Sequence, residues 1–368
     1  MKRALCVILA VLLAVLMGVS VLTVAVSAET VDYYTYSIQN GKATINYVDK
    51  SISGDVVIPA TLGGYPVESI FHGAFESCTK MTSVTIPEGV TFIGSGSFTN
   101  CTALTSVNFP ETLKTIENGA FAMCPSLKVV SLPDGLEKLG DSAFNSCTSL
   151  TSVTLGNGVT YVGNLAFAQC TKLASVNIPD SVKTLGSCAF MNCESLVEIE
   201  IGNGVESIGG GTFSGAVKLQ SVVISDSVKT VLPEAFYNCT ALTEITVGKG
   251  LELVMSGAFP NCFALSDVYY AGSESDWNAI DIQPGNNGFA NATKHFNHGS
   301  IVTMKGDFNG DEILTAADAV LLMNNVLFGD SQYPVIGKCD LDGDGDVDSD
   351  DAVYLLYHIL FGEEYPLA

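Results

Sequence analysis

The chain has 368 residues, of which 16 are basic and 39 are acidic, and its formal net charge is −23. This length allows two or three domains. Residues 301–368 contain 14 acidic residues and two lysines, so about half of the excess charge lies in the last fifth of the chain. No basic stripe of the kind that binds phosphates is present, which argues against a nucleic-acid partner.

The N-terminus carries an apolar segment, residues 4–26, directly after two basic residues. Small residues around Ala28 fit a signal-peptidase site, so we expect residues 1–28 to be a signal peptide that is cleaved before Glu29. The segment is also long enough to span a membrane, and an uncleaved anchor remains an alternative. In both cases the rest of the chain is expected outside the cell, either secreted or at the cell surface.

A 23-residue repeat fills residues 70–266, in nine units without an insertion. The unit is I-G-x-x-A-F-x-x-C-x-x-L-x-x-V-x-I-P-x-x-V-x-x. Self-similarity at this fixed length is typical of a solenoid, in which neighbouring units bury each other's apolar faces. The repeated phenylalanines are Phe75, Phe98, Phe121, Phe144, Phe167, Phe190, Phe213, Phe236 and Phe259.

Each unit predicts the same local structure. Alternation such as Val84-Thr85-Ile86 indicates a short strand, and the Pro or Gly turn after it leads to a second short strand. The A-F-x-x-C segment is expected to form a tight helical turn that places both side chains in the core. The sequence thus predicts a β-rich solenoid with a parallel strand ladder, a cap at residues 29–69 and a second cap at 267–298.

Eight of the eleven cysteines occupy one position of the repeat. A secreted protein with many cysteines suggests disulfides. However, the seventh unit has Ala216 at this position, and stacked cysteines that point the same way are poorly placed for bridging. We therefore expect buried free thiols that behave as small core hydrophobes. The eight are Cys78, Cys101, Cys124, Cys147, Cys170, Cys193, Cys239 and Cys262.

Strand residues that alternate with core positions should form two exposed rows. These rows are either a solvated ladder or a protein-binding surface, as extended solenoid faces often are. Three aromatic residues, Tyr269, Tyr270 and Trp277, are expected to pack the second cap rather than to bind a sugar. One row is Ser83, Ser106, Val129, Ser152, Ser175, Glu198, Ser221, Glu244 and Asp267; the other is Thr85, Asn108, Ser131, Thr154, Asn177, Glu200, Val223, Thr246 and Tyr269.

No catalytic constellation is evident in the sequence, and we expect a protein that is not an enzyme. The four histidines have no partner at a recognisable spacing, although His295 and His298 beside Lys294 give a weak indication of metal binding. Glu198 and Glu200 resemble a glycosidase pair in type, but they lie two apart on one flat strand face, without a cleft.

Two acidic loops in the tail carry the strongest functional pattern. Oxygen-bearing residues at loop positions 1, 3, 5, 9 and 12, with the backbone carbonyl of position 7, suit a hard cation such as calcium. We therefore predict two calcium ions. The ligands of the first loop are Asp307, Asn309, Asp311, Ile313 (carbonyl), Thr315 and Asp318; those of the second are Asp340, Asp342, Asp344, Asp346 (carbonyl), Asp348 and Asp351.

The duplicated loops, each followed by a helical stretch, resemble a type I dockerin domain over residues 299–368. Position 6 is Gly345 in the second loop but Glu312 in the first, where the sharp turn is less favoured. Helices are expected at about 316–328 and 349–361. The resemblance implies contacts with a cohesin domain through Ala316, Ala317, Met323, Asn324, Ser349, Asp350, Leu356 and Tyr357.

The repeat resembles the BspA-like, or treponemal, leucine-rich repeat family over roughly residues 33–296. Together the two resemblances imply a secreted, non-catalytic adaptor. Its dockerin would bind a cohesin of a scaffoldin in a cellulosome-like complex, and its solenoid would bind a protein or surface partner. The loops lack the paired hydroxyl residues of the best-known clostridial dockerins, which implies a cohesin of a different specificity group. Alternatives are a calcium-stabilised cell-surface adhesin and a glycoside hydrolase subunit, although nine uninterrupted units leave no room for an inserted catalytic domain.

Overall fold

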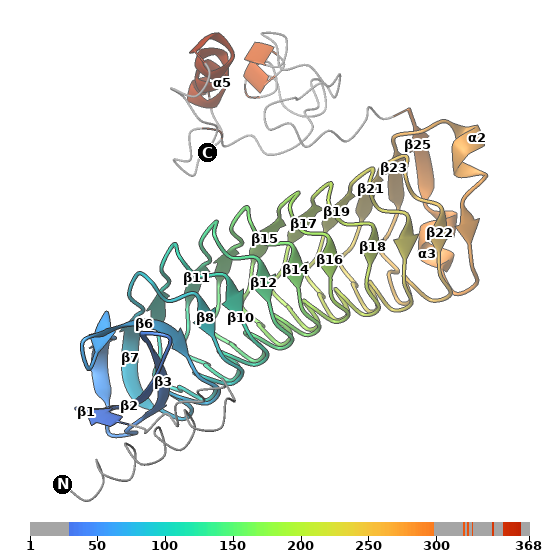
Figure 1. The fold of residues 1–368 in the computed structure, drawn as a ribbon. Helices are drawn as coiled ribbons and strands as arrows, with labels where there is room; N and C mark the ends of the chain where they lie inside the picture. The colour runs from blue at the N-terminus through green and yellow to red at the C-terminus, as the bar shows by residue number, and fades with distance from the viewer. Residues whose placement is uncertain are drawn as a thin grey trace, which may run out of the picture.

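The computed structural model describes residues 29–297 and, after them, residues 319–320, 322–323, 326, 341 and 349–361. The expected signal peptide, residues 1–28, lies outside the described residues. Among the residues that are described, no helix has the length and apolar character needed to cross a membrane. Residues 29–297 form a long β-solenoid rod, and the dockerin region contributes the helix α5 (Figure 1).

One ladder of parallel strands is built from the predicted V-x-I segments. Adjacent strands pair in register one repeat apart, as Ser175 with Glu198 and Asn177 with Glu200. The ladder is divided into a three-stranded and an eight-stranded sheet. Its strands are β4 (Ser53–Val57), β7 (Lys80–Thr85) and β9 (Ser106–Asn108), then β11 (Val129–Ser131), β13 (Ser152–Thr154), β15 (Ser175–Ile178), β17 (Glu198–Ile201), β19 (Ser221–Ile224), β21 (Glu244–Val247), β23 (Asp267–Tyr270) and β25 (Thr293–Phe296).

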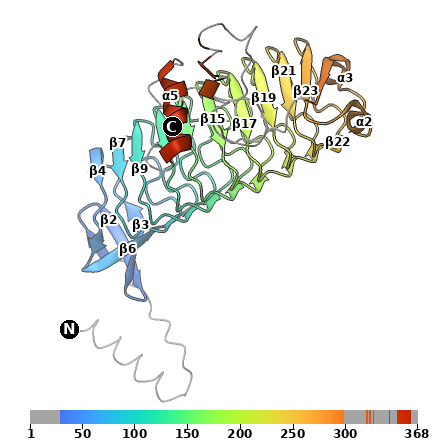
Figure 2. The ribbon, with the colours of Figure 1, turned by 90° about the horizontal axis from the view of Figure 1, so that it is seen from above.

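The second ladder consists mostly of two-residue strands on another side of the rod (Figure 2). It starts with an antiparallel meander, β1 (Glu29–Val31), β2 (Tyr34–Gln39) and β3 (Lys42–Val48), which covers the first units. The strands that follow are β6 (Tyr65–Ile70) with its partner β5 (Thr61–Leu62), β8 (Phe92–Ile93), β10 (Thr115–Ile116), β12 (Lys138–Leu139), β14 (Tyr161–Val162) and β16 (Thr184–Leu185), then β18 (Ser207–Ile208), β20 (Thr230–Val231), β22 (Leu253–Val254) and β24 (Asp281–Ile282).

The phenylalanines of the repeat form a continuous stack along the core. Their ring centroids lie 4.6 Å apart for Phe75 and Phe98 and 5.8 Å apart for Phe190 and Phe213, which are the extremes of the series. Each ring is at most 2% exposed. Stacking at this distance adds to the burial of apolar surface, so every unit stabilises its neighbours.

The A-F-x-x-C segments make closely spaced turns and also bond to the next unit. Within the turn, the N–H of Cys101 donates to the Phe98 carbonyl at 3.3 Å. The residue before it, Asn100, has a φ of +60°, and its N–H reaches the Ala122 carbonyl one unit away at 2.9 Å. This left-handed conformation lets alternate N–H groups point along the rod.

The C-terminal end of the rod is an enlarged turn of the solenoid. Two short helices, α2 (Glu274–Trp277) and α3 (Asn287–Asn291), are inserted here, yet β24 still pairs with β22 and β25 with β23. Phe289 of α3 continues the ring stack at 4.7 Å from Phe259. The period therefore breaks in sequence while the ladder and the core continue.

Candidate functional site

Helix α5 (Ser349–Phe361) follows the second acidic loop, at the bounds predicted from the sequence. Asp350 and Asp351 lie in its first turn and His358 in its last turn, which matches the helix dipole at both ends. In the first predicted helix, residues 319–320, 322–323 and 326 are described and all of them are helical.

One side of α5 packs into a small apolar core. Ala352 and Leu355 are buried there, 3% and 0% exposed, together with Leu341 of the second loop. Met323, predicted as a cohesin contact, is half-buried against this core. The remaining buried members among the described residues are Ala319 and Leu322.

Asp351, the predicted ligand at position 12 of the second loop, occupies the start of this buried side. Its side chain is 1% exposed, and its Oδ1 accepts a hydrogen bond of 2.6 Å from the backbone N–H of Leu341. Asp351 is position 12 of the loop and Leu341 is position 2, so this hydrogen bond holds the start of α5 against the loop. A buried carboxylate is stable only when paired, hydrogen-bonded or bound to a metal, and this donor chemistry fits a calcium ion.

The opposite side of α5 presents a row of exposed apolar residues. Leu356 and Tyr357, both predicted contacts, are 36% and 43% exposed. Val353 and Leu360 extend the row at 40% and 63% exposure. These two residues were not among the predicted contacts, although the i, i+3, i+4, i+7 spacing from Val353 indicates a single helix face.

The predicted contacts Ser349 and Asp350 lie exposed at the start of α5. The other predicted site residues of the tail lie outside the described residues. They are the ligands Asp307, Asn309, Asp311, Ile313, Thr315, Asp318, Asp340, Asp342, Asp344, Asp346 and Asp348 and the contacts Ala316, Ala317 and Asn324.

On the rod, the two predicted rows lie along the ladder of β4 to β25, and all of their members are exposed or half-buried. Glu198 and Glu200 lie two residues apart on β17 and face the same side. Since β17 pairs on both edges with β15 and β19, the two carboxyls lie on an open sheet face. The arrangement does not enclose a scissile bond between opposed carboxylates.

At the C-terminal end of this face, Tyr269 stacks on His295 with ring centroids 4.6 Å apart. The Nε2 of His295 lies 2.8 Å from Oδ1 of Asp267. The pKa of Asp267 is lowered, mainly by hydrogen bonds from Ser266 and His295. Tyr270 and Trp277 are buried in the cap, as predicted for these two aromatic residues.

The described cysteines are free thiols, as predicted, and the eight of the repeat are buried. The Sγ of Cys147, for example, donates to the carbonyl of Phe121 at 3.2 Å, one unit back along the rod. Desolvation is the main cause that raises the pKa of Cys147 and of Cys170. These thiols are therefore structural donors and not nucleophiles.

Both the rod and the dockerin region match known protein families. Residues 68–195 and 163–279 match the BspA type leucine rich repeat region, in six copies, and residues 305–360 match the dockerin type I domain. A leucine-rich repeat protein from Bacteroides ovatus is similar, with 26% identity, 73% of this chain and 78% of that chain covered, and a TM-score of 0.52.

A leucine-rich repeat protein of T. pallidum is 33% identical and covers 52% of this chain and 91% of its own, with a TM-score of 0.48. No curated protein matches the sequence. Both matched families are typically non-catalytic; the dockerin implies a cohesin partner and the repeats imply a protein partner. The chain belongs to the BspA-type leucine-rich repeat family, and it carries a type I dockerin domain at residues 305–360.

Proposed function

We propose that this protein is an extracellular, non-catalytic adaptor. Its dockerin binds a cohesin of a scaffoldin, and its solenoid holds a second partner, a protein or a surface, within the resulting assembly. The observation that carries the docking role is the two-sided α5 helix. Its inner side is anchored by the buried Asp351, and its outer side exposes Val353, Leu356, Tyr357 and Leu360.

Calcium would be held by the carboxylate, amide and hydroxyl oxygens of the two loops, with Asp351 as the last ligand of the second. The ion supplies positive charge that offsets repulsion among these carboxylates, so its binding favours the folded domain. Asp351 orients α5 against the loop through the Leu341 N–H. The exposed apolar row then lies on a helix of fixed orientation, as recognition of a helix face requires.

A pull-down of the full chain with cohesins from the same genome tests this function. Binding is expected with calcium and should be lost with a chelator. A double variant, Leu356→Ala with Leu360→Ala, should lose binding while α5 keeps its helicity, since both side chains point away from the small core. Failure to bind any of these cohesins in calcium would favour the alternative of a calcium-stabilised adhesin.

The rod offers no comparable basis for an enzyme. Its nine units run without an inserted domain, and Glu198 and Glu200 lie on an open sheet face. An assay of the purified chain on plant polysaccharides checks this part of the proposal. Turnover of any of them would contradict the adaptor role and favour a glycoside hydrolase subunit.

A further inference from the structure

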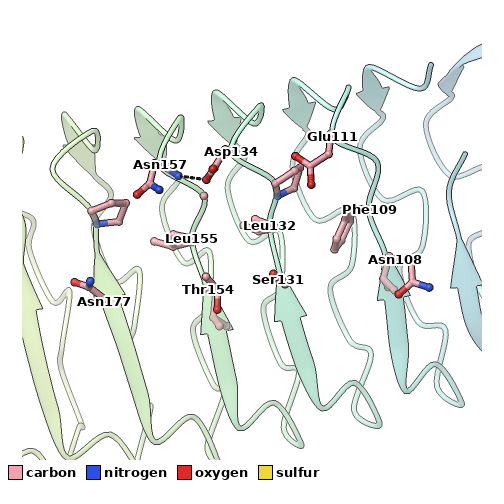
Figure 3. Close-up of a pocket in the computed structure, with 15 residues that line it drawn as sticks. Asn108, Phe109, Glu111, Ser131, Leu132, Asp134, Thr154, Leu155, Asn157 and Asn177 are labelled. Carbon is pink, nitrogen blue, oxygen red and sulfur yellow. Dashed lines mark hydrogen bonds between the residues drawn. The ribbon is translucent and has the colours of Figure 1, made fainter. Parts of the chain in front are cut away.

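A groove of about 590 Å³ crosses four successive units of the rod (Figure 3). Its walls are the C-terminal parts of β9, β11, β13 and β15 and the turns that follow these strands. The volume falls within the range of roughly 300–1,000 Å³ that is typical of ligand sites.

Two departures from the repeat shape this groove. Phe109 replaces the aliphatic residue found in the adjacent units, and its half-buried ring meets Phe121 edge-on at 5.5 Å. At this point the ladder is interrupted, since β9 and β11 belong to different sheets. Gly156 takes the place of the prolines of the flanking units, Pro133 and Pro179, so one wall lacks a side chain in its middle.

Neutral hydrogen-bonding groups recur along the groove once per unit. Ser131 and Thr154 are paired in register on β11 and β13, and Asn108 and Asn177 occupy the same position one unit further out on either side. Neighbouring strands lie about 4.8 Å apart, so these groups form an evenly spaced row. The side chains of Ser131, Thr154 and Asn177 are exposed and make no hydrogen bond to another described residue.

Apart from Asn157, the other lining residues are apolar or acidic. Phe109 is half-buried and contributes apolar surface beside the row, whereas Leu132 and Leu155 lie deeper, 3% and 6% exposed. Glu111 and Asp134 are the charged residues, and Lys, Arg and His do not occur in the lining. Asp134 is engaged in the fold, because its Oδ1 accepts a 2.8 Å hydrogen bond from the Asn157 N–H. A polyanion would therefore be repelled and would find no cation to pair with.

An extended peptide would find few backbone hydrogen-bond partners in this groove. β13 and β15 are each paired on both edges in the ladder, so a peptide cannot add to these strands as another strand. A chain of neutral pyranoses carries hydroxyls along its edges and C–H groups on its faces. The length of one such unit in an extended β-linked chain is close to the spacing of the row.

We propose that the groove binds a segment of a neutral, β-linked polysaccharide. Its hydroxyls bond to Asn108, Ser131, Thr154 and Asn177, and its C–H faces pack on the half-buried Phe109. This assignment rests on the binding role proposed for the rod and names the chemistry of the partner. It does not depend on the docking role.

Affinity electrophoresis of the full chain in gels containing a soluble mixed-linkage β-glucan or a galactomannan tests the proposal, with polygalacturonate as the anionic control. Thr154→Lys, which places a bulky chain in the row, should weaken binding at least tenfold. Thr246→Lys is the matched control, because Thr246 holds the same repeat position on β21, outside the groove. It should bind as the native chain does, and both variants should keep cohesin binding.

Three results would overturn the proposal: no retardation by either neutral glycan, equal loss in both variants, or equal retardation by polygalacturonate. A protein partner that is lost in Thr154→Lys while no glycan binds would also overturn it, but would leave the proposed protein-binding role of the rod intact. Loss of cohesin binding in the native chain would count against docking only.

Discussion

The rod and the dockerin region hold their elements together by different means. The buried apolar cluster of the rod runs continuously from Tyr34 to Ala292. In the dockerin region, the described part of the core comprises Ala319, Leu322, Leu341, Ala352 and Leu355. The rod therefore draws its stability from apolar contacts repeated along its length, whereas a region as short as residues 299–368 can bury less apolar surface and needs a further source of stabilisation.

The same contrast applies to polar groups. In the rod, each repeated turn satisfies its own N–H groups through i→i−3 bonds and bonds to the next unit. In the dockerin region, the carboxylate of Asp351 is buried, and further acidic residues precede it in the second loop. Calcium should therefore control the folding of the dockerin region and leave the rod unchanged.

The largest expected effect of a single substitution is in the rod. Phe167→Ala removes a fully buried ring that stacks at 5.5 Å on Phe144 and at 5.3 Å on Phe190. The cavity and the lost contacts should lower the free energy of unfolding of the rod by about 3–5 kcal/mol. Chemical denaturation measures the loss. Calcium-dependent helicity of the tail should persist, and its disappearance would contradict the independence of the two regions.

Asp351→Ala should destabilise the dockerin region and leave the rod unaffected. It removes the acceptor of the Leu341 N–H and the predicted ligand at position 12, at a cost of about 2–3 kcal/mol for the charged hydrogen bond. Circular dichroism should show that the tail gains less helix on calcium addition. Leu360→Ala, on the exposed side of the same helix, is the control and should respond to calcium as the native chain does.

Alkaline pH should weaken the rod through its thiols. Burial raises the pKa of Cys78 and Cys193 from 9.0 to about 12 in the folded state, while the unfolded thiols ionise near 9. The unfolded chain thus loses protons first, so stability is complete below pH 9 and falls between pH 9 and 12. Each such thiol contributes about 1.4 kcal/mol per pH unit. Thermal unfolding followed across this window measures it, and a flat profile would contradict the prediction.

The smallest effect is expected from Cys147→Ala. The substitution removes the 3.2 Å hydrogen bond from Sγ to the Phe121 carbonyl. Because Ala216 occupies this position naturally in the seventh unit, the loss should be about 1 kcal/mol. A loss as large as that of Phe167→Ala would show that the thiols do more than donate one weak hydrogen bond.

Much of the rod could be predicted because the same residue types recur at the same positions in all nine repeat units. Period, strand alternation, buried phenylalanines and free thiols all follow from residue type at a fixed position. The thiol bonds to the preceding unit were not predicted, because they depend on how the turns align between units. The groove was also missed, since it arises from single departures at Phe109 and Gly156 that change the shape of the rod locally.

In the dockerin region, the sequence predicted helix α5 and two of its exposed apolar residues, Leu356 and Tyr357. Val353 and Leu360 were not predicted, because the dockerin resemblance points to individual contacts and not to the whole exposed side of the helix. The pairing of Asp351 with the Leu341 N–H could not be predicted from residue spacing, because it depends on how the loop folds back on the helix.

Hydrogen–deuterium exchange of the full chain, with calcium and with a chelator, distinguishes the two regions within one sample. Calcium should slow amide exchange in residues 349–361 and leave exchange in residues 70–266 unchanged. Equal exchange in residues 349–361 under both conditions would contradict the claim that calcium folds the docking helix onto its loop.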